Sequence, residues 1–252
     1  MWKMNSKLGS KRLWNIMANS AKNSIEAGGW FNSYTHLPFS SEEMNEYVAD
    51  MKKNICEWID ENSKILEIGC SSGLTMLALC KHVYKYVGID ISRSELDWCQ
   101  RELLRRKLCN VELLEMPANT IDQLDKGFHG IILNSVVHCF NNIEYLEDVI
   151  IKSSLLIEST GFIYIGDVMN LDTKEAFVNS LIEFKKQHPE MKTKTSLENE
   201  LMISPNYFFG LVEKYSFIKD VEIYKKTGTI ENELKKYRYN VMLRIDNANM
   251  GE

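Results

Sequence analysis

The hydrophobic positions of the first 60 residues recur at helical spacing. Apolar side chains three or four positions apart predict an amphipathic helix over 10–28, which ends at a pair of glycines. The residues that set this spacing are Leu13, Ile16, Met17, Ala21 and Ile25. A second helix is expected from Ser41 to about Trp58, with glutamates in its early turns. We therefore expect an N-terminal helical lid over 1–60, with an aromatic loop between its helices.

From residue 61 onward, short apolar strands alternate with helices. The predicted strands are 64–69, 84–90, 111–116, 130–136 and 161–168. The predicted helices between them are 74–83, 94–107 and 143–156. Such alternation indicates βαβ units, and hence a parallel sheet with helices on both faces.

The pattern changes again after the fifth strand. A helix over 173–187 is inserted there, and a helix over 205–215 precedes two further strands, 220–226 and 237–245. A short polar connection joins these two strands, which suits an antiparallel pair at one end of the sheet. The predicted fold class is therefore α/β, with a mostly parallel sheet, an antiparallel end strand and a helical insertion. Residues 61–252 are expected to form one structural unit with the lid.

Composition and charge exclude some functional classes. The chain has 252 residues, of which 44% are hydrophobic, which leaves room for one α/β domain with additions. The formal net charge of -5 disfavours a nucleic-acid partner, because proteins that grip a phosphate backbone usually carry a basic surface. No apolar run approaches the ~20 residues that span a bilayer, and residues 1–17 lack the apolar core of a signal peptide. We therefore expect no membrane partner.

The six cysteines contain no C-x-x-C pair and form no cysteine–histidine cluster with zinc-ligand spacing. We therefore expect no metal site. Unpaired cysteines are typical of a reducing compartment, so the chain is predicted to be cytoplasmic.

The segment KILEIGCSSG, residues 64–73, runs from a buried strand straight into a loop of small residues. In an open α/β sheet, ligands bind beyond the carboxyl ends of the strands, where this loop lies. Gly69 and Gly73 allow the backbone to approach a ligand closely or to adopt a positive φ. The loop also opens a helix, whose free N–H groups can receive a polar ligand group. A plain strand-to-helix turn explains the same residues, so the loop alone is ambiguous.

Asp90 ends the second strand, in the phrase YVGID. A carboxylate at this place can accept hydrogen bonds from the hydroxyls of a ribose. Helix capping or a surface position is the alternative. Together with the 67–73 loop, Asp90 favours a cofactor that carries an adenosyl ribose. Ser71 stands where G-x-G-x-x-G has its middle glycine, which disfavours a dinucleotide with its pyrophosphate.

These segments resemble the motifs of class I S-adenosylmethionine-dependent methyltransferases. LEIGCSSG is similar to the first motif of that family and GIDIS to the second. EMPAN (115–119) is similar to the adenine-binding segment, and IILNSVVHCF (131–140) to the fourth motif. The resemblance implies a Rossmann-like methyltransferase fold, S-adenosylmethionine as cofactor and S-adenosylhomocysteine as its product.

The methyltransferase domains embedded in nonribosomal peptide synthetases show a more extensive resemblance. The similar phrases are GWFNSYTHLPFSSEEM (29–44), NSVVHCFNNIEYL (134–146), GDVMN (166–170) and KYRYNVML (236–243). The similarity covers most of 28–244. The chain shows no carrier, adenylation or condensation segment, so the resemblance implies a free-standing relative of these domains.

The resemblance also assigns site residues. Those it places around the cofactor are Trp30, Tyr34, Glu67, Gly69, Cys70, Ser72, Gly73, Asp90, Ile91, Ala118, Asn119, Asn134 and Ser135. Glu67 and the loop up to Gly73 would hold the methionine part, and Asp90 the ribose. Trp30 and Tyr34 would cover the site, where an aromatic face near the sulfonium is a favourable cation–π contact. Core packing is the alternative for both aromatic residues.

His138 stands where the embedded domains commonly carry Gln. Methyl transfer requires an aligned nucleophile and, where that nucleophile is protonated, removal of a proton. A histidine can act as that base at neutral pH. The C-methyltransferase domains of polyketide synthases carry a His at a similar position, paired with a carboxylate after the fifth strand, and Asp167 is the corresponding carboxylate here. The hypothesis is a catalytic His138–Asp167 dyad; alternatively, His138 merely lines the pocket.

The leading functional hypothesis is a small-molecule methyltransferase of a specialised-metabolite pathway. Its acceptor is an amine, an acidic carbon or a hydroxyl, and a carrier protein or another biosynthetic protein is an expected partner. The aromatics of 170–215 form either an apolar acceptor pocket or the core of their own region, which is favoured for Phe177 and Phe184. The alternatives are a macromolecule methyltransferase and a non-catalytic cofactor-binding protein. Acidic charge argues against RNA as substrate, and the loop, Asp90 and His138 argue against loss of chemistry.

Overall fold

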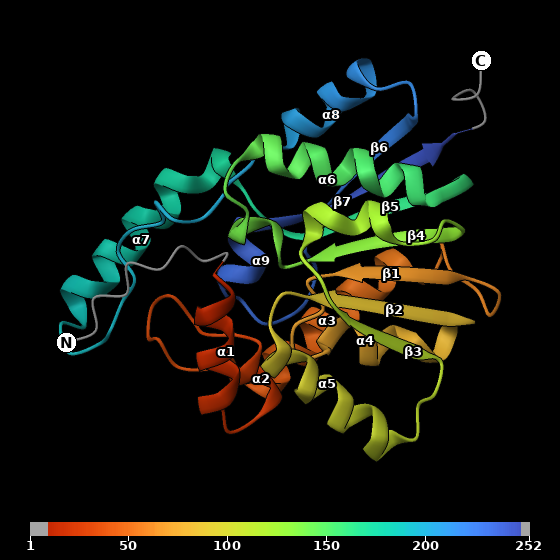
Figure 1. The fold of residues 1–252 in the computed structure, drawn as a ribbon. Helices are drawn as coiled ribbons and strands as arrows, with labels where there is room; N and C mark the ends of the chain where they lie inside the picture. Colours follow the sequence, from red (N-terminus) through yellow and green to blue (C-terminus); the bar gives the residue numbers. More distant parts are fainter. Residues whose placement is uncertain (1–9, 248–252) are drawn as a thin grey trace.

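The computed structural model describes residues 10–247 (Figure 1). The predicted units 1–60 and 61–252 both extend outside the described residues, at 1–9 and 248–252. The division into these two units stays a prediction. Within the described range, no helix is long and apolar enough to cross a membrane.

The lid begins with two helices, α1 (Lys11–Ser20) and α2 (Ser24–Ala27), where the hydrophobic spacing predicted one. The prediction of a continuous helix was wrong because Asn23 is an N-cap. Its side chain accepts a hydrogen bond from the Glu26 N–H at 2.9 Å and starts a new helix. The third lid helix, α3 (Ser41–Ile55), begins as predicted. A capping box fixes this start, in which Ser40 and Glu43 bond each other's backbone N–H.

The sheet has seven strands in the order β3-β2-β1-β4-β5-β7-β6. Their bounds are β1 Lys64–Ile68, β2 Lys85–Asp90, β3 Val111–Glu115, β4 Phe128–Asn134, β5 Ile157–Met169, β6 Ile218–Lys225 and β7 Arg238–Asp246. The first five strands pair in parallel, and β7 runs antiparallel between β5 and β6. The α/β class, the mostly parallel sheet and the antiparallel pair at one end are confirmed.

Helices cover both faces of the sheet (Figure 1). The core helices are α4 Leu74–Leu79, α5 Arg93–Arg106, α6 Ile143–Leu156 and α8 Pro205–Lys214. Short 3₁₀ turns lie at Cys80–His82, Ala118–Gln123, Val137–Cys139 and Leu171–Thr173. Alternate side chains of a strand point to opposite faces. Leu66 therefore packs in the cluster with α6 and α8, whereas its neighbour Ile65 packs in the cluster with α3, α4 and α5.

The inserted helix α7 (Lys174–Gln187) forms a small core with the lid and with the segment before β7. The rings of Tyr34 and Phe184 lie 5.4 Å apart, and Phe177 stacks on Tyr237 at 4.3 Å. The Tyr34 hydroxyl also bonds Ser180 at 2.8 Å. The aromatics of this region thus pack against each other, which was the favoured alternative for Phe177 and Phe184.

The carboxyl ends of the parallel strands meet at one edge of the sheet. Figure 1 shows α1, α2 and the short helix α9 (Glu233–Tyr237), which the hydrophobic pattern did not predict, gathered at this edge. Asn15 of α1 accepts hydrogen bonds from Ser92 and Ser94 at the start of α5, and the Trp98 ring N–H donates to the Ala18 carbonyl. These bonds hold α1 over the strand ends, where a cofactor site is expected.

Candidate active site

A cavity of about 250 Å³ opens at the carboxyl ends of β1, β2 and β4. Its walls come from the loops after these strands, from the lid and from α9. Three non-glycine residues near the ends of strands around it adopt left-handed backbone, namely Ser71, Ser135 and Asp167, with φ of 47°, 56° and 61°. Such conformations cost free energy and concentrate at functional sites.

The loop after β1 forms the floor of the cavity. Gly69 has φ of 75°, and a Cβ there would lie 2.5 Å from Val136 Cγ2, so the close approach of the two loops requires glycine. The Ser72 hydroxyl donates to the Ser24 carbonyl at 2.7 Å and ties the loop to the lid. The backbone of 69–72 is thereby fixed between sheet and lid, in reach of a ligand.

Glu67 lies buried at the end of β1, in the cavity wall. It accepts a hydrogen bond of 2.9 Å from the Tyr86 hydroxyl. Burial raises the pKa of Glu67 to about 8, because the charged form loses hydration without gaining a nearby cation. A cationic ammonium group near this carboxyl would favour its ionised form.

Asp90 ends β2 and lines the same cavity. Its two carboxylate oxygens accept backbone hydrogen bonds from Ser71 at 3.0 Å and from Ser92 at 2.8 Å. Burial raises the pKa of Asp90, and these two N–H groups act in the opposite direction. Both oxygens keep capacity for a further donor, such as a ribose hydroxyl.

Asn134 and Ser135 follow β4 into the cavity wall. Asn134 donates to Thr75 Oγ1 at 2.8 Å and accepts from the Tyr47 hydroxyl at 3.1 Å, so both ends of its amide are satisfied. The Ser135 hydroxyl donates to Asp167 Oδ2 at 2.8 Å. These bonds fix the loop that leads to His138.

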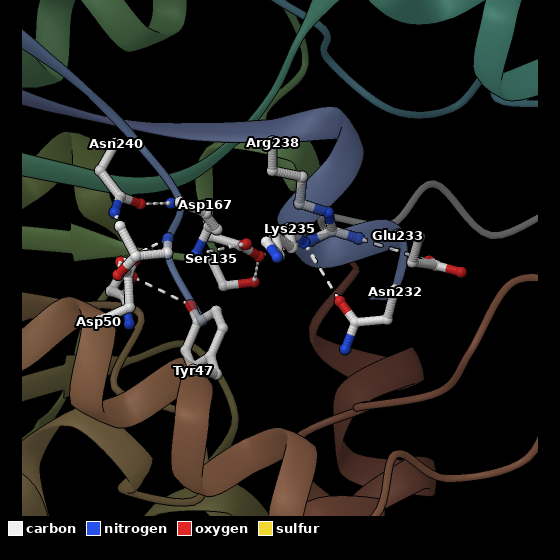
Figure 2. Close-up of polar contacts among 12 residues, drawn as sticks. Tyr47, Asp50, Ser135, Asp167, Asn232, Glu233, Lys235, Arg238 and Asn240 are labelled. Carbon is white, nitrogen blue, oxygen red and sulfur yellow. Dashed lines mark hydrogen bonds and ion pairs between the residues drawn. The ribbon is translucent and has the colours of Figure 1, made fainter. Parts of the chain in front are cut away.

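Asp167 is held by two cations. Its carboxylate lies 2.5 Å from a nitrogen of Arg238, which Figure 2 shows beside it. Lys226 Nζ lies 3.0 Å from the same carboxylate. Its backbone N–H donates to Asn240 at 2.9 Å. Burial alone would raise the pKa of Asp167, but Arg238, Lys226 and the Ser135 hydroxyl together hold that pKa below its usual range. Asp167 therefore stays ionised as the anchor of a buried ion-pair cluster.

His138 lies partly buried in the cavity wall, in the 3₁₀ turn Val137–Cys139. Among the described residues its Nδ1 has no hydrogen-bond partner, and the oxygens of Asp167 are occupied by Ser135, Arg238 and Lys226. The structure therefore does not join His138 and Asp167 as a bonded dyad. Burial and the positive charge of Arg238 lower the pKa of His138 to about 3, so its imidazole is neutral at neutral pH.

The structure brings most of the predicted site residues to one cavity. Those that line it are Trp30, Glu67, Gly69, Cys70, Ser72, Asp90, Ile91, Ala118, Asn134, Ser135 and His138. Those that do not are Tyr34, Gly73, Asn119 and Asp167. Tyr34 packs in the core of α7 and Gly73 is the N-cap of α4. Asn119 faces solvent, where its side chain accepts from Tyr145. These four residues therefore do not contact the cavity in which their proposed roles would be carried out.

Sequence reasoning missed several groups in or beside the cavity. Arg238 lines it and pairs with Asp167, and Glu95 contributes a buried carboxyl from α5. Glu233 joins α9 to the lid by accepting from the Ser33 N–H at 2.8 Å and from its hydroxyl at 2.7 Å. Arg238 stands within the phrase KYRYNVML, so the signal was present for that residue. Glu95 and Glu233 gave no signal of their own, because their positions suit surface glutamates.

Comparison with known proteins shows the class of protein to which this chain belongs. Residues 65–150 match the family described as methyltransferase domain. Chondramide synthase cmdD of Chondromyces crocatus is 30% identical over 238 residues, which cover 90% of this chain and 6% of the synthase. The probable nonribosomal peptide synthetase CymA of Salinispora arenicola is 30% identical over 219 residues, or 85% of this chain and 3% of the synthetase.

Solved structures share the fold. The N-methyltransferase NodS from Bradyrhizobium japonicum WM9, in complex with S-adenosyl-L-homocysteine, superposes with a TM-score of 0.64 at 13% identity. The match covers 95% of this chain and 99% of that one.

The chain is a class I S-adenosylmethionine-dependent methyltransferase. Within this class it is related to the methyltransferase domains of nonribosomal peptide synthetases. The residues of the cavity fit the cofactor. Gly69 gives the close backbone approach, Asp90 offers acceptors for a ribose diol, and Glu67 offers a carboxyl beside the loop.

Proposed function

We propose that this methyltransferase acts on a small-molecule acceptor, at a nitrogen, carbon or oxygen atom, in specialised-metabolite biosynthesis. The observation that carries the proposal is the single cavity shared by the cofactor loop, Asp90 and His138. Because β1 separates β2 from β4 in the sheet, Asp90 and His138 lie on opposite sides of the Gly69 loop. The cofactor would extend along this loop, and the acceptor would enter on the His138 side.

Part of the cavity wall is apolar. Phe31 and Phe39 from the lid and Leu234 from α9 line the cavity together with His138. In the part of the chain that the structure describes, the lysine or arginine that lines the cavity is Arg238, and Asp167 and Glu233 balance its charge. Apolar walls with a few polar groups are typical of small-molecule sites. They do not offer the basic surface that a nucleic-acid substrate would need.

Each residue has a distinct proposed task. S-adenosylmethionine supplies a methyl group activated by its sulfonium charge. Trp30 covers the site with its ring, 4.8 Å from that of Tyr47. His138, neutral at neutral pH, accepts the proton of the acceptor. Asp167 fixes Arg238 and Ser135 rather than the His138 ring, so its proposed part is to position the cavity wall.

The kinship with large synthetases supports the metabolic setting. The chain spans 6% and 3% of the lengths of the two relatives, so their overall activities are no property of this chain. We propose that the acceptor is an intermediate of specialised-metabolite biosynthesis, which reaches the enzyme either free or bound to a carrier protein. The cytoplasmic location and the free-standing state stay predictions.

The test is methyl transfer from radiolabelled S-adenosylmethionine into a host metabolite extract. Label in a small molecule, with a product one methyl group larger by mass spectrometry, supports the proposal. Label in RNA or protein would show a macromolecule methyltransferase instead. Binding of S-adenosylhomocysteine without any transfer would indicate a non-catalytic binding protein.

The role of His138 is tested with His138→Gln, which keeps the side chain polar and removes the basic nitrogen. Loss of a general base is expected to lower turnover about 100-fold while cofactor affinity stays unchanged. His82→Gln, on the exposed surface, is the control. Unchanged turnover in His138→Gln would reject the base and leave His138 as a wall residue.

A further inference from the structure

Glu95 is a buried acid that the proposed chemistry leaves without a task. It lies in the first turn of α5 and its side chain is 1% exposed. It lines the same cavity as Asp90. Its Oε2 accepts a hydrogen bond from the Ser71 hydroxyl at 3.3 Å, and its Oε1 has no partner among the described residues. A buried carboxyl oxygen without a partner is costly unless a ligand completes it.

The local sequence predicts a different position for this side chain. Ser92 to Glu95 read S-x-x-E, the pattern of a capping box, in which the glutamate bonds the N-cap N–H. The same pattern at Ser40 to Glu43 does form a complete capping box in α3. In α5 the Ser92 N–H donates to Asp90 at 2.8 Å instead. Asp90 thereby takes the place of the glutamate and leaves the Glu95 carboxyl available to the cavity.

Ser71 connects the two acids. Its backbone N–H donates to Asp90 and its hydroxyl to Glu95, and it adopts a left-handed φ of 47°. A glycine would take this conformation without strain but would offer no hydroxyl. The serine at this strained position therefore orients Glu95 toward the site that Asp90 occupies.

We propose that Glu95 is a second ribose-binding residue, whose free Oε1 contacts a hydroxyl of the cofactor ribose beside Asp90. The inference rests on the proposed binding of the ribose at Asp90.

The two acids would act in different protonation states. Burial, and then the charge of Asp90, raise the pKa of Glu95 to about 9, so Glu95 carries a proton at neutral pH. A vicinal diol both donates and accepts hydrogen bonds. Asp90 would accept from the diol, and the protonated Glu95 would donate to one of its oxygens.

The experiment is calorimetric binding of S-adenosylhomocysteine to Glu95→Met, Glu95→Gln and the wild type. Loss of a neutral hydrogen bond is expected to weaken binding about three- to tenfold in Glu95→Met. Glu95→Gln keeps a donor and is expected to lose less. Asp97→Asn, exposed on the same helix, is the matched control and should bind as the wild type does. Thermal unfolding of each variant verifies that it is folded.

The ribose contact itself is tested with adenosine, 2′-deoxyadenosine and 3′-deoxyadenosine as competitors. In the wild type, one deoxynucleoside should bind about three- to tenfold more weakly than adenosine, and this difference should shrink in Glu95→Met. An equal loss for all three nucleosides would overturn the inference, because Glu95 would then act only on the fold. Failure of the wild type to bind S-adenosylhomocysteine would instead overturn the cofactor site as a whole.

Discussion

Ser33 donates two hydrogen bonds to the carboxylate of Glu233, one from its backbone N–H at 2.8 Å and one from its hydroxyl at 2.7 Å. The two residues lie 200 positions apart in the chain. Ser33 belongs to the lid, and Glu233 opens the helix that leads into β7. This pair therefore fixes the lid to α9, the short helix that leads into β7.

Ser33→Ala and Glu233→Gln should each lower the free energy of unfolding by about 1.5–3 kcal/mol, because hydrogen bonds to buried charged groups are stronger than neutral ones. The double variant should cost less than the sum of the two, since both variants affect the bond between the Ser33 hydroxyl and the Glu233 carboxylate. Urea unfolding measures all three. Ser20→Ala, on the exposed face of α1, is the control and should change stability little. Strict additivity would show that the two residues act independently.

Gly69→Ala is expected to destabilise the chain by about 2 kcal/mol or more. An alanine would adopt a left-handed φ of 75°, and its Cβ would lie 2.5 Å from Val136 Cγ2. In a Val136→Ala background, Gly69→Ala should lower the free energy of unfolding by less, because the clash with Val136 Cγ2 is gone and the strain of the left-handed backbone remains. Gly210→Ala, in α8, is the matched control. Nothing lies within 4 Å of a Cβ there, so helix propensity should make it slightly stabilising. Equal costs of Gly69→Ala in both backgrounds would contradict the clash.

Protonation of His138 should not lower the rate of methyl transfer on the acidic side of its pH profile. Burial and Arg238 lower the pKa of His138 to about 3, so the imidazole stays neutral from about pH 5 to about pH 8. The wild type and His138→Gln should therefore give kcat/KM profiles of similar shape and different height across this range. A limb near about pH 6.5 that disappears in the variant would show that His138 titrates normally.

Stability should decline with rising pH through Glu67. Its pKa is about 8 in the folded chain, above the ~4.3 of an exposed glutamate, so the folded state binds the extra proton between these values. The stabilisation is fully present below the unfolded pKa and is lost as the pH rises through 8. The Glu67 contribution to this slope is at most about 1.4 kcal/mol per pH unit.

Urea unfolding between about pH 5 and about pH 8 measures this slope. Glu67→Gln should show a shallower decline than the wild type, because its side chain does not titrate. Glu61→Gln, on the exposed surface, should keep the wild-type slope. Identical slopes in the wild type and Glu67→Gln would mean that Glu67 is ionised in the folded chain.

Local patterns were enough to predict most elements of the fold. The apolar strands around Ile65 and Ile132 are short, buried on both faces and separated by helices, so their type followed from periodicity. The break between α1 and α2 could not be found in this way, because the apolar spacing continues across Asn23. Helix α9 is only one turn long and carries too few residues to show a period.

The candidate site was predictable where a residue lies at the end of a strand. Glu67, Asp90 and Asn134 follow or end apolar strands, and the carboxyl ends of parallel strands must meet at one edge of the sheet. Tyr34 was assigned to the same site by the resemblance to methyltransferase domains. The structure packs it against α7, because the insertion offers a buried aromatic surface that the lid pattern does not show.

The sequence by itself determined the α/β architecture and the group of strand-end residues that face one cavity. Hydrophobic period and strand polarity are local properties, and they fix where these side chains emerge. Only the tertiary structure decided which charges meet. Asp167 pairs with Arg238 and Lys226 because β7 runs antiparallel between β5 and β6, which places Arg238 at the start of β7 and Lys226 just after β6 beside it. Glu95 is freed for the cavity because Asp90 caps α5 in its place, and such exchanges of partners depend on distances that no pattern along the chain records.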